Sequence, residues 1–561
     1  MPPQNPIGFG VSDFIELALA ALLFALALVA RPWIEPFARK LAPKTGWCVL
    51  LLALLPVLLR LAMLTHHPVP EPVVYDEFGH LLAADTLLHL RLANPPHPLH
   101  QFFETFFVLQ TPAYASIYPI GQGLTLAIGR AIFGLPWAGV LLSTAAMCGL
   151  CYWMLRGWTT PGWALLGGML AVIEFGPLCS WMNGYWGGSL AAVAGCLVFG
   201  ALPRVRSEGR ARLRISMGAL MGLGIGLHWH VRPYETIFLI LSVLLFLLPG
   251  WRTLRKPALA AAIALLPAIG LSLLQNKAIT GSWTTLPYAL SRYQYGVPAA
   301  FTWQENPQPH EELTREQEMQ YKMQTSFRPA GTETIQSYLQ RLEYRVRFYR
   351  FFFLAPLYVA LPFFFVGLRD LRFLWVTLTL LLFALGVNFY PFFEVHYLGA
   401  LTCLFLLVAV SALHRMDNGA ARLIIYLCLA HFAFWYSRSF FDPPAPERRA
   451  AVNRQIAQSP GKQLVFVRYW PQHIFQDEWV YNAANIDRSR VVWARDLGSS
   501  ENRELLRYYP DRTAWLLEPD AMPPKLTRYQ AEVEQPGIVL PAPKPKLPTA
   551  NKPPLRFEQV Y

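Results

Sequence analysis

Two adjacent carboxylates, Asp76 and Glu77, lie in the stretch VVYDEFGH, about a dozen residues after a strongly apolar segment ends. One interpretation is a solvated loop, and the other is a catalytic acid pair held at a bilayer surface. Asp76 and His80 are four residues apart, so they share a face on a helix, and Asp85 lies further round. A positioned carboxylate can take the proton of an attacking hydroxyl group, so the second interpretation predicts general base chemistry.

The loop that carries this pair is rich in histidine. Six of the thirteen histidines lie in it, at positions 66, 67, 80, 89, 97 and 100. Imidazole and carboxylate groups are common metal ligands, so a divalent metal ion is a candidate cofactor, with Asp76 and His80 as candidate ligands. Such spacings also arise by chance, which leaves the metal open. Glu104, in the same loop, could supply a further carboxylate.

A second polar cluster lies in LHWHVRPYET, where Arg232 ends one apolar segment and Pro233 starts the next. An arginine at such an edge can anchor a helix while its side chain reaches toward water. The alternative is phosphate binding, because guanidinium offers paired donors to phosphate oxygens. The grouping of His230, Arg232 and Glu235 favours the second role, with Arg232 and His230 as the candidate phosphate-binding residues.

Two further segments place polar and aromatic residues at the ends of apolar runs. WMNGYWGGSL is polar and aromatic at a helix turn, where packing through the glycine pair is the alternative role. NFYPFFEVHYLGA holds Glu394 and His396 as further candidate site residues. Ionisable residues near lipid are costly, so several such clusters on one membrane face favour a functional site.

The elements that must position these clusters are membrane helices. The chain has 561 residues, of which 54% are hydrophobic and 15% charged, whereas soluble domains carry about 25% charged residues. Apolar runs, most of them long enough to cross a hydrocarbon core of roughly 30 Å, lie near residues 12–30, 47–64, 135–155, 161–178, 187–202, 215–229, 233–249, 258–274, 351–367, 373–389, 396–413 and 422–438. About twelve or thirteen transmembrane helices follow. The helix near 119–133 is short for a span, and we expect it to be re-entrant or interfacial.

Arginine and lysine set the expected orientation of these helices. Basic residues cluster after the first, fifth and seventh spans, which places those connections in the cytoplasm: Arg31, Arg39, Lys40, Lys44, Arg204, Arg206, Arg210, Arg212, Arg214, Arg252, Arg255 and Lys256. The loops 65–118 and 275–348, and everything after 439, are then outside. The expected location is the inner (plasma) membrane, with an extracytoplasmic site. The net charge of +13 belongs to this topology, so we expect no nucleic acid partner.

The outer segments are expected to fold in different ways. ETIQSYLQRLEYRVRFYRFFF predicts an amphipathic interfacial helix that leads into the ninth span. After residue 439, KQLVFVRY, RVVWARD and TAWLLEPD predict strands, with NRELLRYY as a helix between the last two. The expected fold class is thus an all-α polytopic membrane protein, residues 1–438, with a large first external loop and a small extracytoplasmic α/β domain, 439–535. A Pro-rich tail, 536–561, follows.

Four motifs in this order, DEFGH, YPIGQG, RPYE and VHYLGA, resemble polyprenol-phosphate-sugar-dependent membrane glycosyltransferases of the GT-C superfamily. That superfamily includes protein O-mannosyltransferases and the aminoarabinose transferase of lipid A. The resemblance covers roughly residues 45–415. It implies many transmembrane helices, a large first external loop and a polyprenyl-phosphate sugar donor. It also implies that Asp76 is the acidic residue beside the acceptor, that Glu77 is the second member of the pair, and that Arg232 lies near the donor phosphate.

The expected function is therefore transfer of a sugar from a polyprenyl-phosphate donor, within the lipid bilayer, to an extracytoplasmic acceptor in the cell envelope. The main alternative is a multi-pass transporter or flippase of an envelope precursor. Transporters, however, place substrate sites near the bilayer midplane between repeated halves, and this chain has no visible repeat. A third alternative, a scaffold that binds cell-wall components, leaves the acidic loop unexplained.

Overall fold

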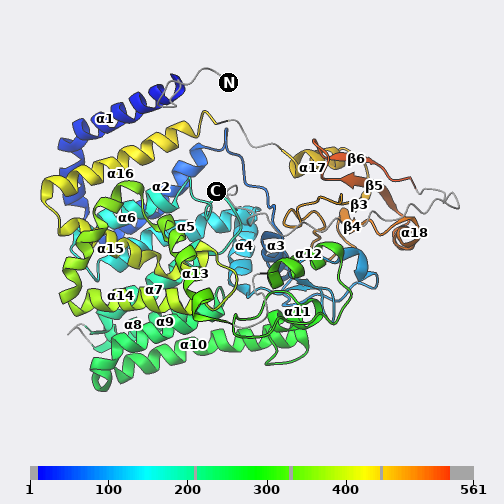
Figure 1. The fold of residues 1–561 in the computed structure, drawn as a ribbon, viewed down its shortest axis with the longest axis horizontal. Coiled ribbons are helices and arrows are strands. Elements are labelled where there is room, and N and C mark those ends of the chain that lie inside the picture. Colours follow the sequence, from blue (N-terminus) through cyan, green and yellow to red (C-terminus); the bar gives the residue numbers. More distant parts are fainter. Residues whose placement is uncertain (1–10, 207–210, 327–332, 443–446, 531–561) are drawn as a thin grey trace.

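The structure is a computed structural model that describes residues 11–206, 211–326, 333–442 and 447–530. The expected Pro-rich tail lies outside these residues. The described chain forms a large helical body and a small domain of strands and short helices beside one end of that body (Figure 1).

Within the described residues, eight helices are long and apolar enough to cross a membrane. They are α1 (Val11–Leu41), α2 (Thr45–Ala62), α5 (Pro136–Leu155), α7 (Gly188–Arg206), α9 (Pro233–Leu247) with the short η2 (Leu248–Gly250), α10 (Trp251–Thr280), α15 (Thr402–His414) preceded by η6 (Val395–Leu401), and α16 (Asn418–Arg438). Shorter helices complete the body: α4 (Ile120–Phe133), α6 (Pro161–Phe175), α8 (Ala211–Trp229) and α14 (Leu371–Val387). The predicted polytopic helical fold is confirmed, and every predicted span but one coincides with a helix of this set.

The exception is the span predicted at 351–367, which is not an α-helix. Its residues form 3-10 segments, the end of η3 (Arg347–Phe352), η4 (Ala355–Val359) and most of η5 (Leu361–Arg369). Pro356 and Pro362 each lie near the start of a segment. Proline lacks the backbone N–H and clashes with the preceding turn, so two prolines six residues apart divide the apolar run into short pieces.

The outer elements gather at one end of the helical body, on the side of the small domain (Figure 1). They are α3 (Tyr75–Leu88), η1 (His100–Phe103), the antiparallel strands β1 (Val108–Leu109) and β2 (Ala115–Ser116), α11 (Pro287–Tyr295), α12 (Arg315–Ser326) and α13 (Ile335–Val346). Of the helix predicted in ETIQSYLQRLEYRVRFYRFFF, Ile335–Val346 form α13, whereas Arg347–Phe352 form the 3-10 segment η3. The predicted convergence of the two long loops and the carboxy-terminal segment on one end of the body is also observed.

The small domain has the predicted α/β composition. Helix α17 (Arg449–Ala457) precedes β3 (Lys462–Val467), β4 (Val491–Arg495), α18 (Ser499–Tyr508), β5 (Arg512–Glu518) and β6 (Lys525–Arg528). The sheet order is β4-β3-β5-β6, with β3 parallel to both β4 and β5 and with β6 antiparallel at the edge. The central strand β3 is buried on both faces, as its continuous apolar sequence LVFV requires.

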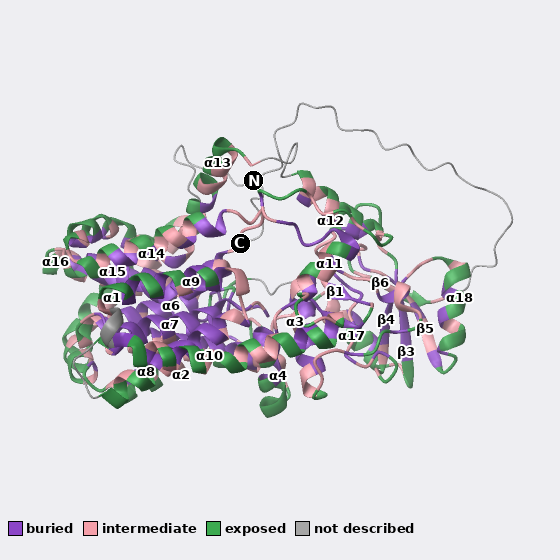
Figure 2. Cartoon of the chain, turned by 90° about the horizontal axis from the view of Figure 1, so that it is seen from below, coloured by how far each residue is buried: buried purple, intermediate pink, exposed green. Residues whose placement is uncertain are grey.

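The first outer loop and the small domain share one hydrophobic core. Loop residues pack in a single cluster with strand and helix residues of the small domain: Leu82, Phe102, Phe103, Val108 and Tyr114 with Leu464, Phe466, Ala484, Ile486, Val492, Ala494, Leu505 and Tyr509. Figure 2 shows buried residues through the centre of the helical body and along β3 and β4. The loop and the domain thus fold as one unit, although about 350 residues separate them in sequence.

Asp85 connects this unit to the helical body. Its Oδ1 accepts a hydrogen bond from Arg130 of α4 at 2.8 Å, and its Oδ2 accepts one from the backbone N–H of Ala484 at 2.7 Å. The Asp85 side chain is 5% exposed, so this carboxylate is a buried link between α3, α4 and the small domain. Its role in the structure is to hold α3 in place.

Candidate active site

Glu77 fixes the start of α3. Its Oε2 accepts the backbone N–H of Val73 at 2.9 Å and that of Val74 at 3.4 Å, which caps the helix. Its Oε1 accepts the N–H of Tyr185, 108 residues away, at 2.9 Å. The side chain is buried, and burial raises the pKa of Glu77 while these amides oppose the rise. Glu77 therefore fixes the backbone around its neighbour and presents no free face to a substrate.

The Asp76 side chain faces a different part of the structure, which contains Tyr118 and His80. Its Oδ1 accepts a hydrogen bond from the Tyr118 hydroxyl, and the Tyr118 ring packs on the His80 ring with centroids 4.5 Å apart. Gln275 of α10 donates to the Tyr118 carbonyl at 2.9 Å, which fixes this tyrosine. Burial raises the pKa of Asp76 to about 6, against the lowering effects of the Tyr118 hydroxyl and of the Arg232 charge. A carboxyl group with this pKa can accept a proton near neutral pH.

Arg232 supplies the positive charge of the site. It precedes α9, and its carbonyl accepts the Thr236 hydroxyl at 2.7 Å. Its guanidinium lies 4.5 Å from the centroid of the Tyr397 ring, and its Nε is buried without a hydrogen-bond partner among the described residues. The Arg232 charge acts on both Asp76 and His80. A cation held by an aromatic face, with donors left over, is arranged to receive an anion.

The turn before α9 contacts the start of α4, and α4 in turn packs against α3. The N–H of Gly121, in the YPIGQG motif, donates to the His230 carbonyl at 2.8 Å. A Cβ atom on Gly121 would lie 2.6 Å from that carbonyl oxygen, so only glycine allows this approach. Two residues earlier in the chain, Pro119 precedes α4 and follows Tyr118. The motif thus brings the Asp76 partner Tyr118 and the Arg232 turn together.

The other two predicted segments join the same site. In WMNGYWGGSL, the Trp186 ring packs on the ring of buried His396 with centroids 4.9 Å apart, and Gln122 donates to the Tyr185 carbonyl at 2.8 Å. In NFYPFFEVHYLGA, Tyr397 lies under Arg232, and Glu394 precedes η6 and acts electrostatically on Tyr75 and Tyr397. All four predicted segments therefore meet at one place.

Among the single residues expected at the site, Glu235 lies close to it and two others lie elsewhere. Glu235 is buried in the first turn of α9 and interacts electrostatically with Arg232. The His230 ring lies beside the backbone of Ala268 on α10, so its side chain is not placed with Arg232 as expected.

Glu104 also lies away from Asp76. His100 and Tyr295 interact with its side chain, and Arg495 of the small domain donates to its carbonyl at 3.5 Å. The expected further carboxylate is therefore bound by His100 and by Tyr295 of α11, and Glu104 contacts the small domain through its backbone.

Several aromatic and basic residues of the site were not predicted. Tyr118 is the first residue of the YPIGQG motif, and the sequence does not indicate that its hydroxyl binds Asp76. Tyr288 packs edge-on against Tyr118 with centroids 5.8 Å apart, and the nearby Arg292 interacts electrostatically with Tyr288 and Tyr390. Tyr288 and Arg292 come from α11 and Tyr390 from the segment after α14, so only the tertiary fold brings them to Asp76.

Among the described residues, the candidate metal ligands Asp76 and His80 have no third His, Cys, Asp or Glu ligand grouped with them. Asp76 and His80 lie one turn apart on α3, but no group of three or more His, Cys, Asp or Glu side chains in the described ranges is placed to hold a metal ion. One oxygen of Asp76 accepts the Tyr118 hydroxyl, and the Arg232 cation acts on both residues, which opposes a second cation. Burial and the Arg232 charge lower the pKa of His80 to about 3, so its imidazole is neutral.

Comparison with known proteins supports the fold and not the chemistry. No family model and no curated protein matches the sequence. The crystal structure of ArnT from Cupriavidus metallidurans in the apo state aligns with a TM-score of 0.54 at 12% identity, over 85% of this chain and 93% of that chain. The structure of that protein bound to undecaprenyl phosphate gives 0.50 at 11% identity, over 84% and 93%.

A third solved structure, the Archaeoglobus fulgidus oligosaccharyltransferase in complex with Zn and sulfate, aligns with a TM-score of 0.45 at 11% identity, over 84% of this chain and 67% of that chain. The likeness to ArnT extends over 85% of this chain and 93% of that chain, and it shows that the two chains share a fold.

The geometry predicts that neutralising Glu77 destabilises the folded protein more than neutralising Asp76 does. Three N–H donors point at the Glu77 oxygens, so in Glu77→Gln the amide NH2 must face at least one of them. We expect this variant to lose about 1–3 kcal/mol of unfolding free energy. Asp76→Asn keeps an oxygen for Tyr118. Since burial raises the pKa of Asp76 to about 6, its carboxyl is ionised at pH 7.5 in both the unfolded and the folded protein. Folding buries this charge at a cost, so the neutral amide is expected to cost no stability.

Thermal unfolding of both variants in one detergent at pH 7.5 measures this difference. A lower midpoint for Asp76→Asn than for Glu77→Gln would contradict the assignment of the two roles.

Proposed function

We propose that this protein is an integral membrane glycosyltransferase that moves a sugar from a polyprenyl-phosphate donor to an extracytoplasmic acceptor of the cell envelope. The observation that carries the proposal is the Asp76 carboxylate, held by Tyr118, in the same site as the Arg232 cation stacked on Tyr397. A proton acceptor and an anion-binding group are the two functions that such a transfer requires.

The role of Arg232 follows from the charge that develops in the reaction. When the bond between the sugar and the phosphate oxygen breaks, the electron pair remains on that oxygen, and the leaving lipid phosphate gains negative charge. Arg232 is already fixed by its backbone and by Tyr397, so it can stabilise this charge without reorganisation. Arg292, whose charge acts on Tyr390 as that of Arg232 does, is a second cation available to the same phosphate.

The role of Asp76 concerns the acceptor. An acceptor hydroxyl attacks the anomeric carbon, and its proton passes to the Asp76 oxygen that does not hold Tyr118. The new bond joins the acceptor oxygen to the sugar, and the products are the glycosylated acceptor and the lipid phosphate. Tyr118 keeps one oxygen occupied, which leaves the other oriented toward the substrate.

The fold supports a lipid-linked donor. The chain shares the fold of a protein that was solved with undecaprenyl phosphate bound. A site at the end of a helical bundle is accessible to a lipid phosphate whose polyprenyl chain remains in the bilayer. From the distribution of Arg and Lys, we propose that this end faces the outside of the inner membrane.

Removal of the proton acceptor is the main test. Asp76→Asn should remain folded and inserted but lose transfer by about 100- to 10,000-fold, the usual contribution of general base catalysis. The assay follows release of undecaprenyl phosphate from undecaprenyl-phosphate-linked sugars by purified protein, at equal protein amounts.

Glu104→Gln is the matched control, because it neutralises a carboxylate of the same loop whose contacts are with His100 and Tyr295. Near-normal transfer by Asp76→Asn would contradict the assignment of Asp76 as the proton acceptor. A transporter would release no lipid phosphate in either protein.

The acidic limb of the pH profile should report Asp76. Its carboxyl must be ionised to accept a proton, so transfer should fall as the pH decreases through about 6. The Tyr118 hydroxyl stabilises the charged form, so Tyr118→Phe should raise the pKa of Asp76 and move the limb to higher pH. The profile of kcat is measured between pH 4.5 and 8.

Tyr288→Phe is the control, since it removes a neighbouring phenol and leaves the Tyr118 hydrogen bond in place. An acidic limb that stays in place in Tyr118→Phe would argue against Asp76 as the titrating group.

Phosphate binding by Arg232 is tested by affinity. Arg232→Ala should weaken binding of undecaprenyl phosphate by about 10- to 100-fold, the range expected for lost hydrogen bonds to a charged group. Arg232→Lys should restore only part, because ammonium keeps the charge but lacks the planar fork. Arg347→Ala, which removes an exposed arginine paired with Glu343, is the control. Unchanged affinity in both Arg232 variants would return Arg232 to the role of an interfacial anchor.

A further inference from the structure

Helix α12 interacts with the small domain through Glu316 and with the start of α3 through Gln320. The buried face of α12 is polar and consists of Glu316, Gln317, Gln320 and Gln324, each less than 10% exposed. Polar side chains at such depth are costly unless they bind specific partners. The partners of two of them, Glu316 and Gln320, belong to the small domain and to α3.

Toward the small domain, Glu316 forms an ion pair with Arg495, the last residue of β4. Both side chains are nearly buried, at 9% and 11% exposure. Arg495 also donates to the Glu104 carbonyl and lies 5.6 Å from the centroid of the Tyr469 ring. One partner of a buried pair cannot be removed without leaving an uncompensated charge, so this contact fixes α12 on the sheet.

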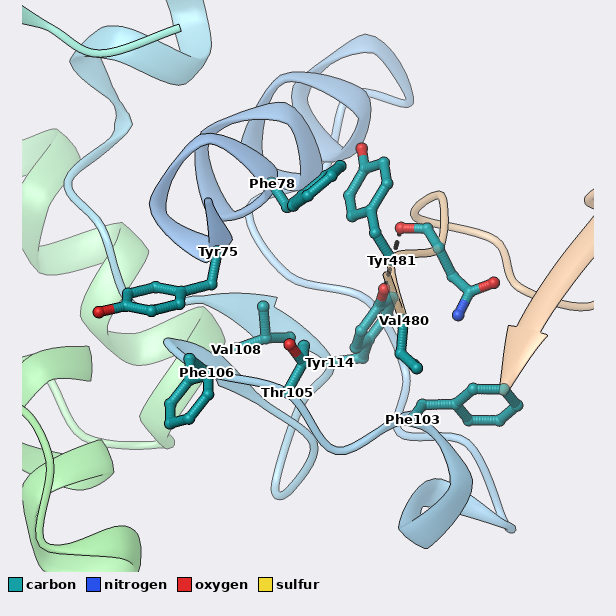
Figure 3. A pocket seen from close by; sticks show the side chains of 10 residues that line it. Tyr75, Phe78, Phe103, Thr105, Phe106, Val108, Tyr114, Val480 and Tyr481 are labelled. Carbon is teal, nitrogen blue, oxygen red and sulfur yellow. Dashed lines mark hydrogen bonds between the residues drawn. The ribbon is translucent and has the colours of Figure 1, made fainter. Parts of the chain in front are cut away.

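Toward the site, the Gln320 side chain is a neighbour of Tyr75, and its hydrogen-bonding effect on the hydroxyl opposes the rise that burial causes in the pKa of Tyr75. Tyr75 is the first residue of α3 and precedes Asp76. Figure 3 shows its ring beside Phe106, with the hydroxyl directed away from Tyr481 and Tyr114 and toward the green helical segments. The Tyr75 ring is held by Phe106 and Phe107, with centroids 4.8 and 5.0 Å away.

The backbone before α3 is also bound to the small domain. The N–H of Glu478 donates to the Val73 carbonyl at 3.1 Å, and Val74 forms an antiparallel bridge with Asp477. The Glu478 carboxylate accepts the hydroxyls of Thr105 and Tyr469. The same short segment gives its N–H groups to Glu77, so the domain and Glu77 both hold it in place.

We propose that the small domain is part of the catalytic apparatus, and that Arg495, Glu316, Gln320 and Tyr75 are positioning residues that set the place of Asp76. This inference rests on the proposed function for the role of Asp76, but the contacts that carry it do not. A displacement of a reacting group by about 1 Å can cost 100-fold in rate, so a domain that holds the first turn of α3 controls transfer.

Two conservative variants separate positioning from folding. Tyr75→Phe keeps the buried ring and removes only the hydroxyl, and Gln320→Leu removes the amide at the other end of the same contact. Each should lower kcat by about 10- to 100-fold and leave the KM for undecaprenyl-phosphate-linked sugar within about twofold of the unmodified protein. The kcat of the double variant should be no lower than that of the slower single variant. Full kcat in both single variants would overturn the role of this contact.

The ion pair is tested by exchanging its charges. In Glu316→Gln and in Arg495→Met, backbone amides 73–77 should exchange with deuterium about tenfold faster than in the unmodified protein, and kcat should fall. The double variant Glu316→Arg with Arg495→Glu should restore slow exchange and at least part of kcat. Lys462→Met, which removes an exposed pair with Asp511 at the other end of β3, is the control and should change neither readout.

The two proposals fail in different ways. Unchanged exchange at 73–77 in both single variants, or fast exchange that the charge exchange does not restore, would overturn the positioning role. Normal transfer by Asp76→Asn, with exchange behaving as expected, would leave the coupling between domain and helix in place and remove only the proposed function.

Discussion

Three backbone N–H groups from two distant parts of the chain converge on the carboxylate of Glu77. Each would cost about 1–3 kcal/mol if it were buried without an acceptor, so the carboxylate fixes all three positions together. On one side it sets where α3 begins and hence where Asp76 lies. On the other side it holds Tyr185, whose neighbour Trp186 packs on His396. The relative position of both halves of the site depends on this single side chain.

The same geometry explains why two adjacent carboxylates can have different functions. Successive residues of a helix point about 100° apart, so Asp76 and Glu77 face different walls. Glu77 meets backbone amides that satisfy its charge, whereas Asp76 has the Tyr118 hydroxyl and the more distant Arg232. Burial is therefore less compensated at Asp76, which raises its pKa to about 6 and leaves it able to exchange a proton near neutral pH.

Much of the architecture follows from apolar runs and charge, because both are local properties of the sequence. The spans, the amphipathic α13 and the strands β3, β4 and β5 were predictable for this reason, and the topology alone indicated that the segments around Asp76 and Arg232 meet. The prediction of a span at 351–367 was wrong because hydropathy does not include the effect of Pro356 and Pro362 on helix geometry. Hydropathy and hydrogen-bonding geometry are separate constraints, and the second decided this segment.

The side-chain details were less predictable. Helical phase could have distinguished the histidines near Arg232: His228 and Arg232 are four residues apart, and the Arg232 N–H donates to the His228 carbonyl, whereas His230 lies on another face beside α10. Tyr118, Tyr288 and Arg292 had no such signal, since aromatic and basic residues at the ends of spans also serve as interfacial anchors.

Within the described residues no ion pair joins Arg232 to Asp76. A direct pair would lower the pKa of Asp76 and occupy the guanidinium. Arg232 stacks instead on Tyr397, which is consistent with the roles proposed for Asp76 as proton acceptor and for Arg232 as phosphate-binding group.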